Sequence, residues 1–318
     1  LLLLLARIPD VLFLAVPLGY NQKLMPENGL ERISILIEFN VLQKISEVRE
    51  QVSKWKSEGL SVGLVPTMGG LHNGHKSLIK SASKSCDRVI VSIFINPTQF
   101  GDEEDLDKYP KTQERDCFLI NDAGGSAAFI PNVLEMYPIG FATKVSVSGL
   151  TNILCGASRP GHFDGVTQIV AKLLNQVSAD RAFFGEKDWQ QLTVIRRLVR
   201  DLDISTKIIS VATVRDEFGL ALSSRNSYLD SSQLNIARKL SSILQMSAYN
   251  IASGGYSSVE CAQAAQILLE SGFEKIDYLE CRNSHSLDLI ERTTEDECRI
   301  FAAVYINNVR LIDNHVVV

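Results

Sequence analysis

The stretch VPTMGGLHNGHKS, residues 65–77, decides the fold, because an apolar run leads into a glycine-rich turn and then into a segment with helical periodicity. Gly69 and Gly74 are spaced as in the phosphate-binding P-loop, G-x-x-x-x-G-K-S, but His75 stands where the lysine should be. Lys76 follows one position late, which turns its side chain roughly 100° around a helix. The sequence therefore argues against a P-loop.

Two functional interpretations of this turn remain. His72 and His75 could ligate a metal, but zinc needs further His, Cys or carboxylate ligands, and no second pair of suitable spacing occurs. We assign no metal to side chains. In the other interpretation the turn is an H-x-G-H nucleotide site, where imidazoles at a helix start donate hydrogen bonds to ATP phosphates as pyrophosphate leaves. A purely structural role in capping the turn explains two histidines around one glycine less well.

The segments around this turn predict an α/β domain with a parallel sheet, because strand and helix patterns alternate along the chain. A helix is predicted over 41–57, ended by Gly59. Strands are predicted at 60–66, 88–96, 126–131, 180–185 and 206–214, and helices at 75–86, within 101–120, at 161–178 and at 189–202.

The pattern changes after about Thr213. Helices are predicted over 231–252 and 257–271, and strands over 275–282, 299–306 and 309–318, as in a smaller α+β unit. We therefore predict a Rossmann-like catalytic domain over 39–212 and a smaller C-terminal domain over 213–318, which closes over the nucleotide site. Residues 1–38 are expected to be an unassigned and poorly ordered extension, since charged residues and prolines interrupt their apolar run.

Composition excludes some partners. The chain of 318 residues has 32 basic and 37 acidic side chains, so no overall positive charge attracts it to nucleic acid or an anionic membrane. Six cysteines lack a C-x-x-C pair, which favours reduced thiols and a cytoplasmic location.

Further polar clusters are expected at the carboxyl ends of strands, where open parallel sheets bind ligands. Gln99 in NPTQF, 96–100, can hold a hydroxyl or carboxylate, and Lys187 in GEKDWQQ, 185–191, can hold a phosphate. In LALSSRN, 220–226, Ser223, Ser224 and Arg225 could clamp a triphosphate.

A fifth cluster, GASRPGHFD at 156–164, carries Arg159 and His162 and is expected to be a mobile cover. Each cluster alone is typical of a solvated loop, but together they favour a site.

Taken in order, PTMGGLHNGH, SIFINPTQF, GASRPGHF, FGEKDWQQ and LALSSRN resemble the pantoate–β-alanine ligase family. The resemblance runs from about residue 40 to the C-terminus, including the closing LIDN. It implies an ATP-dependent condensation of pantoate with β-alanine through an enzyme-bound pantoyl adenylate, which yields pantothenate, AMP and pyrophosphate. It also implies a homodimer, a Rossmann-like N-terminal domain and Mg²⁺ on the ATP phosphates.

The resemblance also assigns site residues. Catalytic roles fall to His75 as general acid, and to His72, Lys187, Ser223, Ser224 and Arg225. Gln99 and Gln191 are implied to hold pantoate and β-alanine. The implied ATP-binding residues are Met68, Gly69, Gly70, Leu71, His72, Asn73, Gly74, His75, Gly185, Glu186, Lys187, Asp188, Val214, Leu222, Ser223, Ser224 and Arg225.

Two positions depart from the family pattern. Cys155 stands in place of a usual glutamate, and Phe218 replaces the aspartate of a usual Asp-Gly turn. Two alternatives also stay open: a nucleotidylyltransferase that would use the same turn to join AMP to a phosphorylated acceptor, and a non-catalytic nucleotide-binding protein.

Overall fold

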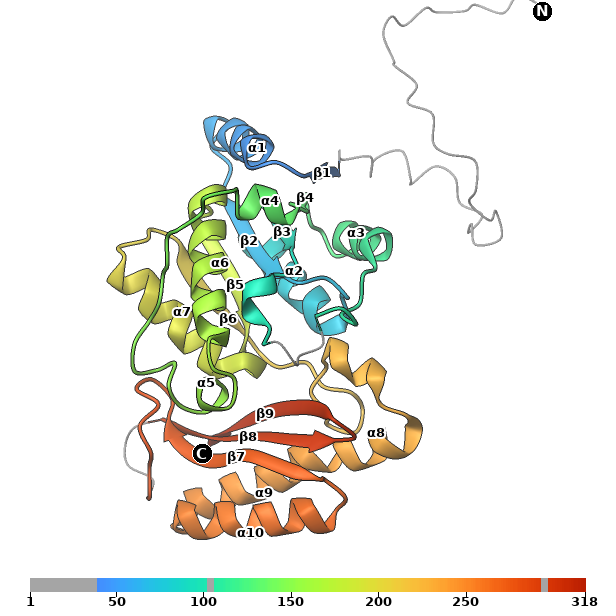
Figure 1. Ribbon diagram of the computed structural model, residues 1–318, viewed down its shortest axis with the longest axis vertical. Helices are drawn as coiled ribbons and strands as arrows, with labels where there is room; N and C mark the ends of the chain where they lie inside the picture. Colours follow the sequence, from blue (N-terminus) through green and yellow to red (C-terminus); the bar gives the residue numbers. More distant parts are fainter. Residues whose placement is uncertain (1–38, 102–105, 293–296) are drawn as a thin grey trace, which may run out of the picture. The chain divides into compact units, whose positions relative to one another are not determined.

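The computed structural model describes residues 39–101, 106–292 and 297–318 (Figure 1). The predicted extension at 1–38 lies outside the described residues. None of the helices in the described ranges is long and apolar enough to cross a membrane.

Six parallel strands form the larger sheet, in the spatial order β1-β4-β3-β2-β5-β6. Their bounds are β1 Asn40–Leu42, β2 Val62–Thr67, β3 Arg88–Ile93, β4 Ala127–Phe129, β5 Arg181–Gly185 and β6 Lys207–Val211. From β2 the chain adds β3 and β4 on one side and then crosses to add β5 and β6 on the other. The strand order therefore reverses between β2 and β5, and ligands of open α/β sheets bind at the carboxyl end of such a switch point.

Helices cover both faces of this sheet, so its strands are apolar on both sides. Leu64 and Ile90 pack in one core cluster, while their chain neighbours Val65 and Val91 pack in another. The first cluster contains residues of α1 (Ile45–Ser57), α6 (His162–Val177) and α7 (Trp189–Asp201), and the second those of α2 (Asn73–Ser85) and α3 (Gln113–Asp122). Two short helices, α4 (Val133–Met136) and α5 (Cys155–Ser158), lie between α3 and α6 in the chain.

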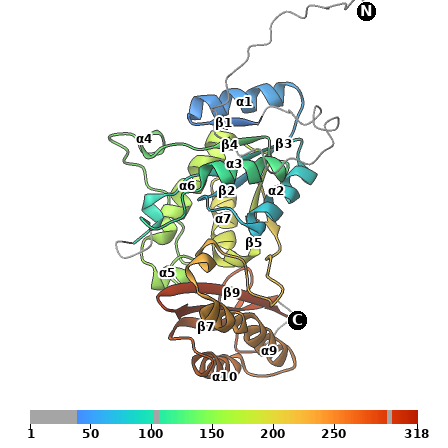
Figure 2. The same cartoon turned by 90° about the vertical axis from the view of Figure 1, so that its right-hand side faces the viewer.

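The C-terminal part contains an antiparallel sheet of three strands, β7 Lys275–Asn283, β8 Cys298–Ile306 and β9 Val309–Val317. Asn307 and Asn308 form the tight turn between β8 and β9 with φ values of 44° and 63°, which asparagine tolerates better than most residues. Helices α9 (Lys239–Ala252) and α10 (Ser257–Glu270) cover one face of this sheet (Figures 1 and 2). Helix α8 (Ser231–Ala237) precedes them.

The structure confirms the predicted fold class, a parallel α/β sheet followed by a smaller α+β part, and corrects some elements. The helix predicted from Val41 begins only at Ile45, because residues 40–42 pair with β4 as an edge strand that local periodicity does not reveal. The helix predicted over 231–252 is divided at Arg238. The domain bounds of 39–212 and 213–318 stay a prediction.

Candidate active site

The glycine turn after β2 is held by a carboxylate from α3. Gly69 and Gly70 have φ values of 89° and 61°, in the left-handed region that favours glycine. Asp116, only 1% exposed, accepts hydrogen bonds from the backbone N–H groups of Gly70 and Leu71, both at 2.9 Å. The hydrogen bonds of these two N–H groups therefore hold the glycine turn in place. Asp116 is not among the residues predicted from the sequence, since a single acidic residue in an amphipathic helix carries no distinguishing signal.

His72 and His75 form a reciprocal cap at the start of α2. Nδ1 of His72 accepts a hydrogen bond from the N–H of Gly74 at 3.1 Å, and Nδ1 of His75 accepts one from the N–H of His72 at 3.3 Å. Because Nδ1 is an acceptor in both rings, each neutral ring carries its proton on Nε2. A Cβ atom at Gly74 would lie 2.8 Å from the His72 ring, so this cap requires glycine between the histidines.

Both imidazoles are neutral at pH 7. Burial, and after it the nearby Lys187 cation, lowers the pKa of His72 to about 4. Burial, together with His72 and then Lys187, lowers the pKa of His75 to about 3. The pair therefore presents two uncharged N–H donors beside a lysine, which is an arrangement suited to an anionic ligand.

The neighbouring Lys76 does not take the place of a P-loop lysine. Its Nζ forms an ion pair with Oδ2 of Asp122 on α3, at 2.5 Å. For the metal interpretation, the described ranges hold no group of three or more His, Cys, Asp or Glu side chains that could bind a metal ion.

A cavity of about 240 Å³ lies at the carboxyl ends of β2 and β5, at the switch point of the sheet. It brings together most of the predicted site residues, namely Met68, His72, Gly74, His75, Gln99, Gly185, Lys187, Asp188, Gln191, Val214, Leu222, Ser223, Ser224 and Arg225. Five predicted residues do not line it: Gly69, Gly70, Leu71, Asn73 and Glu186. Asp116, which holds the glycine turn, does not line the cavity either.

One wall of this cavity is apolar and was missed by sequence analysis. Val166, Ile169, Val170 and Leu173 of α6 line it. Their spacing in the sequence indicates only the buried face of a helix, so the pattern could not distinguish a substrate wall from the core.

The amide of Gln99 is oriented within this cavity. Gln99 is only 9% exposed, and its Oε1 accepts a hydrogen bond from Nδ2 of Asn96 at 3.0 Å. Asn96 is itself buried and also donates to the backbone carbonyl of Gly165 on α6. The Gln99 side chain is therefore fixed by a residue that sequence analysis did not single out.

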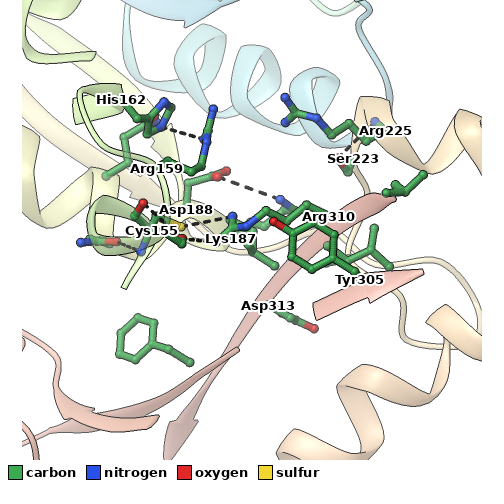
Figure 3. A pocket seen from close by; sticks show the side chains of 18 of the residues that line it. Cys155, Arg159, His162, Lys187, Asp188, Ser223, Arg225, Tyr305, Arg310 and Asp313 are labelled. Atoms are coloured by element: carbon green, nitrogen blue, oxygen red, sulfur yellow. Dashed lines mark hydrogen bonds and ion pairs between the residues drawn. The ribbon is translucent and has the colours of Figure 1, made fainter. Parts of the chain in front are cut away.

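A larger cavity of about 980 Å³ shares Lys187, Asp188, Gln191, Ser223 and Arg225 with the smaller one. Figure 3 shows Lys187 and Asp188 on one side of it and Ser223 and Arg225 on a separate loop. The C-terminal strand β9 contributes Arg310 and Asp313 to the lining (Figure 3). The larger cavity thus lies between the α/β part and the C-terminal strands, beside the histidine cap.

The segment expected to cover the site is attached to the Gln99 loop. His162 Nδ1 lies 2.8 Å and Arg159 Nη2 lies 3.4 Å from the backbone carbonyl oxygen of Gln99. The segment consists of α5, a turn and the start of α6. Whether it moves stays a prediction.

The two residues that depart from the family pattern, Cys155 and Phe218, each contact a residue of the C-terminal part. Cys155 Sγ lies 3.1 Å from the hydroxyl of Tyr278 on β7. At the other departure, the Arg238 guanidinium stacks on the Phe218 ring at 3.9 Å. The turn there is still formed, because Asp216 Oδ1 accepts hydrogen bonds from the N–H groups of Phe218 and Leu220.

The sheet is Rossmann-like, and a histidine-capped helix begins at its switch point. The same cavity is lined by a lysine, an arginine and serine hydroxyls. These features define an α/β enzyme of the H-x-G-H nucleotide-using class. The model of the pantoate-beta-alanine ligase family matches residues 40–316. The chain belongs to this family. Its ligase activity, the ATP-dependent condensation of pantoate with β-alanine, is as predicted, and neither alternative function is supported.

Similar proteins agree with this assignment. The pantothenate synthetase of Dinoroseobacter shibae is 50% identical over 275 residues, which cover 86% of this chain and 98% of the relative. The crystal structure of pantothenate synthetase from Thermus thermophilus matches with a TM-score of 0.81 and 40% identity over 87% of this chain and 99% of that one. The Francisella tularensis pantoate-beta-alanine ligase complexed with beta-gamma ATP and beta-alanine matches with a TM-score of 0.73 and 36% identity, over 87% and 97% of the two chains.

Proposed function

We propose that this chain forms pantothenate in two steps at the joined cavities, first making pantoyl adenylate and then transferring the pantoyl group to β-alanine. The observation that carries the proposal is that one cavity is lined both by the histidine cap, Lys187 and Arg225 and by the amides of Gln99 and Gln191. Cations and N–H donors suit a triphosphate, whereas neutral amides suit hydroxyl and carboxylate groups.

In the first step a pantoate carboxylate oxygen attacks the α-phosphorus of ATP. The bond from the α-phosphorus to the bridging oxygen breaks, and pyrophosphate leaves with the electron pair. Negative charge therefore builds up on the β and γ phosphates, where Lys187, Arg225 and the Ser223 and Ser224 hydroxyls stabilise it. An acyl phosphate route would instead require these groups around a transferred γ-phosphoryl.

His72 and His75 act on the same departing group. Their Nε2–H groups are fixed by the reciprocal Nδ1 contacts, so no reorganisation is needed when the charge develops. Burial keeps the pKa of both rings far below neutral pH, so both rings are uncharged donors. His75 is predicted to be a general acid. We propose that it acts instead by donating a hydrogen bond from its neutral imidazole.

Pantoate binds between the apolar wall and the amides. Its two methyl groups pack against Val166, Ile169 and Val170 of α6, while its hydroxyl and carboxylate groups bond to Gln99 and Gln191. In the second step the neutral amine of β-alanine attacks the acyl carbon. A carbon–nitrogen bond forms, the carbon–oxygen bond to AMP breaks with its electron pair on AMP, and the nitrogen releases one proton, so pantothenate and AMP result.

Mg²⁺ is proposed to bind with the substrate rather than at a protein cage. Mg²⁺ prefers oxygen ligands and usually keeps several waters, and ATP phosphates supply such ligands. Asp188, whose side chain lines both cavities, offers a carboxylate to a hydrated ion. Asp188 would hold the hydrated ion, which would supply positive charge to the phosphates alongside Lys187.

We also propose a homodimer in the cytoplasm, with the C-terminal part of each chain closing over its ATP site. The resemblance of the ordered motifs supports the dimer, and the six unpaired cysteines support a reducing compartment. The lining of one cavity by Lys187 and by Arg310 and Asp313 supports closure between the predicted domains.

Rapid quench of the enzyme with labelled ATP, pantoate and Mg²⁺ tests the mechanism. Without β-alanine, we expect release of one pyrophosphate per site, followed by AMP and pantothenate when the amine is added. ADP as a product, or no pyrophosphate until β-alanine is present, would overturn the adenylate route. Omitting Mg²⁺ in the presence of a chelator should suppress the first step.

A further inference from the structure

Asn314 on β9 contacts the loop that carries Lys187, although the two residues lie far apart in the chain. Its Nδ2 donates hydrogen bonds to the backbone carbonyl of Glu186 at 2.9 Å and to that of Lys187 at 3.0 Å. These carbonyls belong to the two peptide groups on either side of the Lys187 Cα atom. A single side-chain amide therefore holds both peptide planes that set the φ and ψ angles of Lys187.

The orientation of this amide is fixed by its surroundings. Oδ1 of Asn314 accepts a hydrogen bond from Nη1 of Arg299 at 3.0 Å, and arginine can only donate. Nδ2 must then face the two carbonyls, which can only accept. Arg299 is in turn stacked on the ring of Trp189 at 3.5 Å, at the start of α7. Asn314 is only 4% exposed, so water does not compete for these contacts.

The loop itself has little local support for its geometry. Residues 186–188 form a single 3-10 turn, and Gly185 before it offers no side-chain cap. Asn314, by contrast, lies within β9, which pairs with β8 along its whole length. The adjacent Asp313 carboxylate is held by Arg215 through two hydrogen bonds, at 2.6 and 2.8 Å. A rigid strand thus supports a short loop.

We propose that Asn314 is a positioning residue for the adenylation step, which sets the direction of the Lys187 side chain toward the departing phosphates. The inference rests on the proposed role of Lys187 in that step. It makes the C-terminal sheet a part of the adenylation machinery through the backbone of residues 186–188, in addition to its role in lining the larger cavity.

The test compares Asn314→Ala, Lys187→Ala and the double variant by pyrophosphate release in the absence of β-alanine. Asn314→Ala should lower the rate about 10- to 100-fold, as expected for a misplaced catalytic group. In the Lys187→Ala background the same change should have almost no further effect. The KM for pantoate should stay near that of the wild type, because Gln99 and Gln191 are untouched.

Asn314→Asp separates positioning from packing. Aspartate has nearly the same volume and keeps the Arg299 contact, but it has no donor for the two carbonyls. We expect it to be impaired like Asn314→Ala, whereas a packing role would leave it close to the wild type. Asn250→Ala, which removes one hydrogen bond to Glu260 in the same C-terminal part, is the control and should keep the wild-type rate.

The outcomes distinguish two failures. If Lys187→Ala is as active as the wild type, the proposed role of Lys187 is wrong. If Lys187→Ala is impaired but the effects of the two substitutions multiply, Lys187 acts in the reaction and the positioning role of Asn314 is wrong. Melting temperatures accompany each rate, and loss of folding in both Asn314 variants would also overturn the positioning role.

Discussion

The backbone N–H of His72 donates a hydrogen bond to Nδ1 of His75, 3.3 Å away, and the two rings lie with their centroids 4.2 Å apart. Helix caps usually rely on serine, threonine or aspartate, which would bring hydroxyl or anionic groups to this position. A cap made of two imidazoles leaves two Nε2–H donors instead. The same contacts that cap the start of α2 therefore select the tautomer that an anionic ligand needs.

Replacing either histidine should remove one of these donors from the departing pyrophosphate. We expect His75→Ala and His72→Ala each to slow adenylation by about 10²–10³, or roughly 3–4 kcal/mol. Pyrophosphate release measured in the absence of β-alanine gives this rate. Rates within a few-fold of the wild type, in protein with an unchanged melting temperature, would contradict the assignment of the cap.

The low pKa of His75 predicts a pH dependence of stability. In the unfolded chain a histidine titrates near pH 6.5, whereas burial holds the pKa of folded His75 at about 3. Between these values the unfolded state binds the proton and the folded state does not, so stability falls as pH falls. Above pH 6.5 the contribution disappears, because both states are neutral.

His75→Gln isolates this effect. Between pH 7 and pH 5 the free energy of unfolding of the wild type should fall by about 2 kcal/mol more than that of the variant. Urea titrations at the two pH values provide the measurement. Equal losses in both proteins would show that His75 is not buried in its neutral form.

Gln99 and Gln191 should affect pantoate binding and leave ATP binding nearly unchanged. Truncation to alanine leaves polar partners without a hydrogen bond, at a cost of about 1–3 kcal/mol for each residue. Calorimetric titration of each variant with pantoate and, separately, with ATP measures the two affinities. An equal loss for both ligands would contradict the division between amides and phosphate-binding groups.

Asp116 and Asp122 on α3 form a matched pair for testing the support of the glycine turn. Asp116→Ala leaves the N–H groups of Gly70 and Leu71 without their acceptor, so we expect a loss of about 1–3 kcal/mol in stability together with slower adenylation. Asp122 only pairs with Lys76 at the surface, and its removal should cost at most about 1 kcal/mol. Thermal unfolding and pyrophosphate release compare the two variants. Similar effects of both changes would mean that Asp116 does not hold the turn.

Local sequence was sufficient for most elements of the larger sheet. Runs such as 89–95 are almost entirely apolar because helices cover both faces, and this pattern is visible without a structure. It could not reveal β1 at 40–42, whose strand conformation depends on pairing with β4 almost ninety residues later. The local pattern also did not show that the helix predicted over 231–252 is divided at Arg238. The guanidinium of Arg238 bonds to Asp216 in a distant loop.

The sequence by itself determined which segments carry the chemistry, because glycine, histidine, lysine and serine at the ends of predicted strands are recognisable from residue type and spacing alone. Only the tertiary structure decided how they are held. Asp116 supports the turn from α3, α6 provides an apolar wall, and Asn314 reaches the Lys187 loop from β9. Such contacts join residues far apart in the chain, so they impose no periodicity on the sequence near either partner.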